Sequence, residues 1–180
     1  MKQRKIYHAR LMYARPFIDS LDFARNGEHI SGELQVAELP RLLDALETPQ
    51  GVLHYTVQGG VDKQGIHFLD VGVAGLCRLR CQRCLEGMDY PVRLDTRLLL
   101  RDQAGLDALD DDEAGEKEEE FDSILADTHL NVLDMLEEEI LLSLPIAPKH
   151  ELGACQATDG KNTQRGEQNP FAVLAKLKRN

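Results

Sequence analysis

The spacing of hydrophobic residues changes along this chain, and each spacing predicts a different kind of element. Over residues 16–24 the apolar positions recur at helical spacing, with Pro16 acceptable in the first turn. A weak alternation over residues 30–37 predicts a strand. A second helix is predicted to begin at Pro40 and to end before Pro49. We therefore expect two short helices around one strand in this part of the chain.

The middle of the chain has the two-residue period of β-strands. Strands are predicted over residues 52–58, 66–80 and 90–101. The glycine-rich residues 59–65 predict a turn between the first two strands, and residues 81–84 predict a tight loop between the last two. Three consecutive strands with short connections predict an antiparallel meander.

One face of the predicted meander is rich in arginine. Because side chains alternate along a strand, the third strand carries three arginines on one face and apolar residues on the other. The preceding strand adds two more, and if the register aligns them the patch consists of Arg78, Arg80, Arg93, Arg97 and Arg101. This patch is a candidate RNA-binding surface, because arginine forks pair with phosphate oxygens. The alternative is a solvated outer face, although such faces usually mix charges of both signs more evenly.

The best-defined helix is predicted over residues 131–144. Asn131 is its N-cap, Asp134 follows three residues later in a pair that resembles a capping box, and Pro145 ends it. Its apolar stripe consists of Val132, Leu133, Leu136, Ile140 and Leu144. The acidic residues 137–139 are expected to face solvent. We predict an α+β fold in which this helix and smaller flanking helices pack against an antiparallel sheet.

The remaining segments are predicted to be flexible, except for a short peptide at the C-terminal end of the sequence. Residues 1–150 are expected to form a single α+β domain that contains a flexible acidic loop at 102–120. Residues 151–168 predict a flexible linker, and residues 169–180 predict a short helix. So short a helix is unstable alone in water, so it needs a groove on this domain or on a partner. The candidate partner-docking residues are Phe171, Val173, Leu174 and Leu177.

Composition and charge narrow the class of protein. A chain of 180 residues with 42% hydrophobic residues can bury the core of one domain. The net charge of −10 is local, because residues 107–120 hold nine acidic residues and one lysine. No apolar run approaches the ~18 residues that span a bilayer, and the basic N-terminus lacks the apolar core of a signal peptide. We expect a soluble cytoplasmic protein with no membrane contact, and the overall charge argues against general polyanion binding.

The cysteines are the main candidates for chemistry. Cys81 and Cys84 form a C-x-x-C pair, which is half of a zinc site, and His150 with Cys155 is a candidate second pair of ligands. Cys77 is a further candidate ligand. Two alternatives remain open. One is an inert set of buried or free thiols, and the other is a redox pair, which would be expected to open a helix in a βαβ unit.

Motifs of known catalytic sites are missing from the sequence. It contains no phosphate-binding P-loop, no G-x-S-x-G elbow and no H-x-x-x-H metal pair. The remaining histidines are scattered singly along the chain. We therefore expect a protein that is not an enzyme.

Three segments of the chain are distinctive in combination: CQRCLEGMDYPV at 81–92, LDMLEEEILLSLPIAPKH at 133–150 and NPFAVLAKLKRN at 169–180. Together they resemble the YceD family, the bacterial large ribosomal RNA subunit accumulation proteins. The resemblance extends over roughly residues 50–180, with the segments in the same order and an acidic stretch before the helix. The first fifty residues match more loosely.

The resemblance implies a non-enzymatic cytoplasmic factor for the accumulation of 23S rRNA, and hence for biogenesis of the large ribosomal subunit. Many relatives have a C-x-x-C pair and further cysteines after the segment that corresponds to Leu144-Pro145 in this chain. Here Cys81 and Cys84 match the first pair, and Cys155 with His150 stands where the later cysteines would be, without the fuller set. The implied cofactor is one structural zinc ion.

Two kinds of partner are consistent with the sequence. The first is 23S rRNA or a large-subunit precursor particle, which the arginine-rich strand faces favour. The second is a ribosomal protein or an assembly factor, bound by an adaptor that makes no direct contact with RNA. The adaptor is favoured by the acidic net charge and by the low aromatic content of five Phe, four Tyr and no Trp, because single-stranded RNA is usually bound on aromatic side chains.

Overall fold

A single curved sheet contains most of the strands in this computed structural model, which describes residues 6–8, 16–111, 121–151 and 153–155. The strand order is β1-β3-β4-β5-β6-β7. The strands are β1 (Ile6–His8), β3 (His29–Gln35), β4 (Val52–Val61), β5 (His67–Arg80), β6 (Gly87–Arg101) and β7 (Asp122–Leu125). Strands β3 to β6 are antiparallel, whereas β1 and β7 pair in parallel with their neighbours. The predicted antiparallel meander and the α+β class are confirmed.

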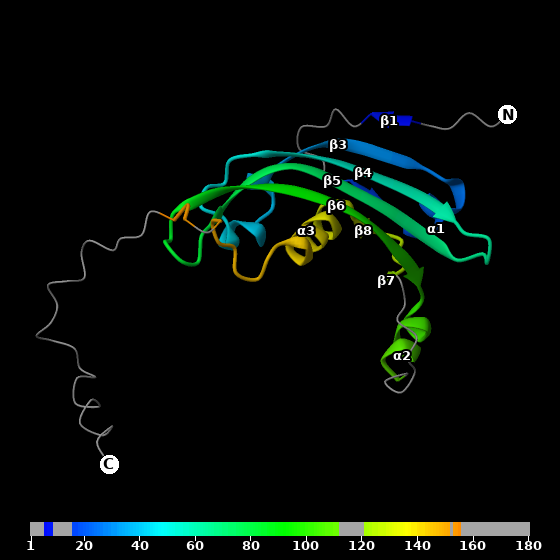
Figure 1. Cartoon of the computed structure of the whole chain (residues 1–180). Coiled ribbons are helices and arrows are strands. Elements are labelled where there is room, and N and C mark those ends of the chain that lie inside the picture. The colour runs from blue at the N-terminus through cyan, green and yellow to red at the C-terminus, as the bar shows by residue number, and fades with distance from the viewer. Residues whose placement is uncertain (1–5, 9–15, 112–120, 152, 156–180) are drawn as a thin grey trace, which may run out of the picture.

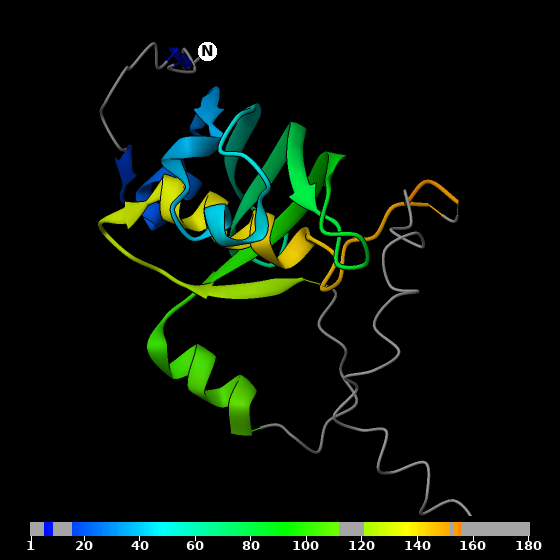
Figure 2. The ribbon, with the colours of Figure 1, turned by 90° about the vertical axis from the view of Figure 1, so that its left-hand side faces the viewer.

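The main helix and the 3-10 helices pack against the concave face of the sheet. Figures 1 and 2 show α3 (Val132–Ser143) beneath the sheet beside the 3-10 helices η1 (Val36–Glu38) and η2 (Leu42–Ala45), and no helix of the described residues covers the convex face. The core forms between these helices and the inward side chains of the strands, and its largest members are fully buried. They include Leu53, Val57, Leu69, Val71, Leu98, Leu136 and Ile140. Each such side chain stabilises the fold by about 1.5–3 kcal/mol relative to an exposed position. Within the same residues, no helix is long and apolar enough to cross a membrane.

The N-terminal helices are shorter than the sequence predicts. Phe17 and Ile18 form β2, which pairs with β8 (Leu130–Asn131), and α1 (Ser20–Asn26) begins only after Asp19. The side chain of Asp19 accepts the backbone N–H of Asp22 at 3.0 Å and so caps the helix. The helix predicted from Pro40 is a single turn of 3-10 helix, η2.

The predicted acidic loop at 102–120 begins with a helix. Residues Gln103–Asp111 form α2, and Asp102 accepts the backbone N–H of Gly105 at 2.8 Å at its start. Residues 112–120 lie outside the described residues. Residues 156–180 also lie outside them, and these include most of the predicted linker and the whole terminal peptide with its docking residues.

The acidic run on α3 does not face solvent as predicted. Glu137 is only 3% exposed and Glu139 only 7%. Glu138 between them is exposed, with 61% of its side chain accessible. The prediction was wrong for Glu137 and Glu139 because the curved sheet and the 3-10 turns contact α3 on more than its apolar stripe.

Candidate metal centre and convex sheet face

The C-x-x-C pair occupies a tight turn between the two longest strands. Strand β5 ends at Arg80, and the backbone N–H of Cys81 then donates to the carbonyl of Glu86 at 2.9 Å. The N–H of Leu85 donates to the carbonyl of Cys81 at 2.9 Å, with Leu85 in the left-handed region at φ 63°. These bonds fold the turn back on itself and bring the thiols of Cys81 and Cys84 together.

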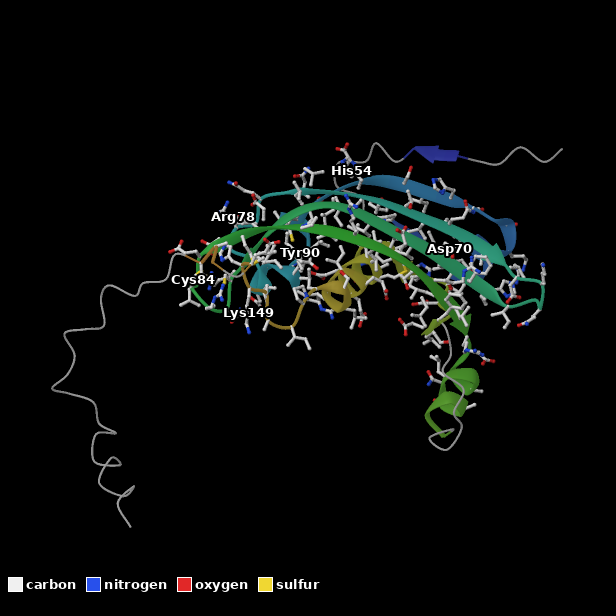
Figure 3. All side chains as sticks on the ribbon, viewed as in Figure 1. His54, Asp70, Arg78, Cys84, Tyr90 and Lys149 are labelled. Carbon is white, nitrogen blue, oxygen red and sulfur yellow. The ribbon has the colours of Figure 1, made fainter. Side chains whose placement is uncertain are left out.

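A second segment, which follows α3, is held against this turn by its own backbone. The N–H of Gln82 donates to the carbonyl of Pro148 at 2.8 Å, which places His150 beside the cysteines. The N–H of Ala154 donates to the carbonyl of Glu151 at 3.1 Å, and the chain then returns to the turn at Cys155. In Figure 3, Cys84 and Lys149 accordingly lie at the same end of the sheet.

The four predicted metal ligands meet at this place. One ligand atom from each of Cys81, Cys84, His150 and Cys155 lies within 4.8 Å of all the others. The Sγ atoms of Cys81 and Cys155 are 3.7 Å apart. Nδ1 of His150 lies 3.4 Å from Sγ of Cys84 and 3.6 Å from Sγ of Cys155. Two segments of the chain thus form one cluster, although the paired residues are separated by 66 to 74 positions in the sequence.

These distances suit a tetrahedral zinc ion. With Zn–S bonds of ~2.3 Å and Zn–N bonds of ~2.0–2.1 Å, ligand atoms at tetrahedral corners would be roughly 3.8 Å apart for two sulfurs and roughly 3.5 Å apart for sulfur and nitrogen. The measured separations of 3.7, 3.4 and 3.6 Å agree with these values. Three thiols and one imidazole are also a standard donor set for a structural zinc site. The cluster therefore fits a metal such as zinc in both geometry and chemistry.

The pKa values of Cys81 and Cys84 also favour a metal site. Burial alone would raise the pKa of Cys81, but backbone hydrogen bonds, first among them that of Cys84, lower this pKa to about 5. One of these bonds comes from the N–H of Arg83, which donates to Sγ of Cys81 at 3.5 Å. A backbone hydrogen bond at Glu86 lowers the pKa of Cys84, but desolvation and the neighbouring sulfurs outweigh it and raise that pKa. A thiolate at Cys81 beside a protonated thiol at Cys84 is expected where like charges repel, and a bound cation would remove that repulsion.

Arg83 completes the cluster from the middle of the C-x-x-C motif. Its Nε donates to Sγ of Cys155 at 2.9 Å. Its Nη2 donates to the carbonyl of His150 at 3.2 Å and to that of Glu151 at 3.4 Å. The hydrogen bond to Cys155 raises the pKa of Arg83. One cationic side chain therefore fixes both later ligands to the turn and offsets thiolate charge.

Cys77, the fifth candidate ligand, is apart from this cluster. It is 3% exposed, lies in the hydrophobic core, and has a pKa that burial raises to about 11. Such a thiol behaves as a small buried hydrophobic side chain.

The five predicted arginines share the convex face of the sheet but do not form a compact patch. They follow β5 and β6 from Arg80 at one end of the hairpin to Arg101 at the other. Acidic residues lie among them: Arg78 is 3.6 Å from Asp89, and Arg80 is 3.5 Å from Glu47. This face therefore mixes charges of both signs, unlike the arginine-rich face that strand alternation alone suggested.

Arg97 is the most firmly held of these arginines. It donates two hydrogen bonds to the carboxylate of Asp70, at 2.6 and 2.9 Å. Its guanidinium carbon lies 3.8 Å from the ring centroid of Phe68 and 5.6 Å from that of Phe121. Arg101 donates to the hydroxyl of Ser123 at 2.9 Å.

Comparison with known proteins identifies the family. The model of the family described as Large ribosomal RNA subunit accumulation protein YceD matches residues 69–178. This chain belongs to the YceD family. A relative from Haemophilus influenzae, the Large ribosomal RNA subunit accumulation protein YceD, is 25% identical over 168 residues, which cover 89% of this chain and 94% of the relative. No solved structure gives a significant match.

The YceD match covers the parts of the chain that carry the candidate site. It includes most of β5, all of β6 and α3, and all four cluster residues, so the candidate metal centre lies within the family segment. It also extends over residues 169–178 of the C-terminal peptide, which is one of the three segments that carry the resemblance. The family assignment made from the sequence is confirmed.

Sequence reasoning did not find Arg83 or Phe68. Arg83 could have been noticed as the one charged residue inside the C-x-x-C motif. Phe68 had no such signal, because its contact with Arg97 depends on the register between β5 and β6.

Proposed function

We propose that this chain is a non-enzymatic cytoplasmic factor that promotes accumulation of 23S rRNA and so assembly of the large ribosomal subunit. The observation that supports this most is the YceD family match over residues 69–178, which contains the sheet hairpin, α3 and the Cys3His cluster. The Haemophilus influenzae relative is likewise named as a large ribosomal RNA subunit accumulation protein.

We propose further that Cys81, Cys84, His150 and Cys155 hold one structural zinc ion. Four protein ligands fill a tetrahedral site and leave no position for a substrate, which is the arrangement of structural rather than catalytic zinc. The ion would cross-link the end of the β5–β6 hairpin to the segment after α3. It would therefore stabilise the end of the sheet and the segment that follows α3 up to Cys155.

We propose direct contact between the convex sheet face and RNA, with the exposed arginines meeting phosphates. Arg93 is exposed on β6 and no ion pair is recorded for it within the described residues. The contact would be limited in strength, because Arg78, Arg80 and Arg97 already have acidic neighbours. Backbone contacts of this kind position a protein on RNA without reading its sequence.

The same ion pairs favour a second candidate function. A face on which arginines pair with Asp89 and Asp70 has little net charge to offer a polyanion. An adaptor that binds a ribosomal protein or an assembly factor would need no such charge. The C-terminal peptide, with Phe171, Val173, Leu174 and Leu177, is our proposed docking element for a protein partner.

The experiment that tests the main proposal is depletion of this protein in its own cells. We expect the ratio of 23S to 16S rRNA to fall and free large subunits to decrease in a sucrose gradient. Expression of the wild-type chain should restore both, and the Cys84→Ser variant should restore them less well than Cys77→Ala, which leaves the cluster intact. An unchanged ratio in depleted cells would refute the proposed function.

Crosslinking in cells separates the two candidates. After ultraviolet crosslinking, direct RNA contact predicts recovery of 23S rRNA fragments with the purified protein. The adaptor predicts chemical crosslinks to a ribosomal or assembly protein and no RNA above the background of an uncrosslinked sample.

A further inference from the structure

A shallow hollow of about 590 Å³ lies on the convex face, away from the metal centre. In Figure 3 its member Asp70 lies toward the end of the sheet opposite to Cys84. This volume is within the ~300–1,000 Å³ range of small-ligand sites. It is lined by His29, Thr56, Gln58, Asp70, Val71, Gly72, Asp95, Thr96, Arg97 and Phe121.

Strand register explains why a hollow forms here. Two neighbouring rows of residues cross the sheet from β3 to β6, and their members are cross-strand partners. The first row is His29, Gln58, Asp70 and Arg97, and the second is Ser31, Thr56, Gly72 and Asp95. Gly72 lets the side chains of Thr56 and Asp95 approach the backbone in the second row. A Cβ atom at Gly72 would lie 2.8 Å from Oγ1 of Thr56 and 3.3 Å from Oδ1 of Asp95, so any larger residue would displace these side chains.

The Asp95 carboxylate differs from the other aspartates on this face. Asp70 pairs with Arg97, and Asp89 lies 3.6 Å from Arg78. Asp95 is exposed, and across from it stands Gly72 instead of a cation. The Asp95 side chain forms no ion pair or hydrogen bond with the described residues. Its oxygens are thus available at the edge of the hollow to accept hydrogen bonds from a ligand.

The side of the hollow next to Asp95 is formed by the guanidinium group of Arg97 and the ring of Phe121. Arg97 is fixed by Asp70 and by the ring of Phe68, and Phe121 lies on the hollow with 37% of its surface exposed. Rings and guanidinium planes are the surfaces on which unstacked nucleobases are bound. A partly exposed ring close to a free carboxylate can therefore contact both the face and the edge of one base.

We propose that this hollow binds one unstacked guanine base of single-stranded RNA, an inference that rests on direct RNA contact by the proposed function. The Asp95 carboxylate accepts the two adjacent donors of guanine, N1–H and N2–H, and no other RNA base presents two adjacent donors on that edge. The base stacks at Phe121, and Gly72 adds no side chain between Thr56 and Asp95. The carboxylates of Asp70 and Asp95 make the hollow unsuitable for a phosphate group.

The test is the difference in affinity between oligonucleotides that vary at one base. The probes are fluorescein-labelled RNA nonamers of uridine with a central guanine, adenine or uridine, measured by fluorescence anisotropy on the full-length protein. We expect the guanine nonamer to bind about tenfold or more tightly than the other two, because a good bidentate base contact discriminates by that order. Asp95→Asn replaces one acceptor oxygen with a donor and should abolish the preference.

Asp89→Asn is the matched control. It removes the same charge from the same strand face outside the hollow, so it should raise affinity for all three nonamers and keep the guanine preference. Equal binding of the three nonamers by the wild type, or a preference that survives Asp95→Asn, would overturn the proposal. Neither outcome affects the depletion test, so failure of the guanine site and failure of the rRNA accumulation role are separate results.

Discussion

The carboxylate of Glu137 on α3 accepts the backbone N–H of Leu42, at 3.0 Å, across a sequence separation of 95 residues. The same Oε1 accepts the N–H of Arg41 at 2.6 Å. The donors at the start of a 3-10 turn have no partner within the turn, so a side chain from another element satisfies them. One buried acid thus joins η2 to the main helix.

Glu137→Ala should lower the free energy of unfolding by about 2–3 kcal/mol, because it leaves a buried backbone N–H without an acceptor. Urea denaturation followed by circular dichroism measures the change. Glu138→Ala is the control, and it should change the value by less than about 0.5 kcal/mol, since Glu138 is exposed and its contact with Arg41 is 4.0 Å long. Similar effects of the two variants would contradict the capping role.

The purified protein should contain close to one zinc ion per chain. Cys84→Ser should lose this ion and lower the melting temperature, because binding of a structural metal contributes directly to folding. Elemental analysis and calorimetry measure the two quantities. Cys77→Ala should retain the zinc, as Cys77 lies in the core outside the cluster. A metal-free wild type whose melting is unaffected by Cys84→Ser would exclude the zinc site.

Glu139 should make stability depend on pH. Desolvation by burial, with smaller contributions from Asp122 and Glu138, raises the pKa of Glu139 in the folded protein. Between the ordinary pKa and this raised value the unfolded chain has lost the proton and the folded chain keeps it, so stability falls as pH rises through that window. Glu139→Gln cannot lose a proton. The variant should therefore gain stability relative to the wild type as pH rises, and the gain should reach a plateau above the raised pKa.

Denaturant titrations from about pH 4 to about pH 8 cover the ordinary pKa of a glutamate and the range above it. A difference between Glu139→Gln and the wild type that is constant over this range would show that packing, and not ionisation, separates them.

The arginines of the convex face should determine how RNA affinity depends on salt. If they contact phosphates, each arginine lost should flatten the plot of log affinity against log salt by ~0.7–0.9 or less. The variant is Arg93→Gln, Arg97→Gln and Arg101→Gln combined, and the probe is a large-subunit RNA fragment. Arg25→Gln is the control for charge, because Arg25 is exposed on α1 and pairs with Asp22 away from this face. Unchanged affinity and slope in the triple variant would favour the adaptor.

Deletion of residues 169–180 should leave the melting temperature nearly unchanged and weaken association with large-subunit precursors. The reason is that the peptide is too short to be helical alone and carries apolar residues for a partner groove. Sedimentation of tagged protein with precursor particles measures the association. A large loss of stability on deletion would place the peptide in the core of this domain instead.

The sequence alone was sufficient for the elements that depend on local pattern. The two-residue period identified β4, β5 and β6 as an antiparallel meander. Asn131 was correctly identified as the cap of α3, and its side chain accepts the N–H of Leu133 at 3.1 Å. Local rules work here because a cap and a strand face involve residues close together in the chain.

Only the tertiary structure decided which distant residues meet. The sequence could name His150 and Cys155 as candidate ligands with Cys81 and Cys84, but only the return of the segment after α3 to the hairpin places them beside these cysteines. The pairing of Arg97 with Asp70 follows from a register that places them across from each other on β6 and β5. The periodicity of a single strand shows which residues share a face, but the free energy of packing the whole sheet selects their neighbours.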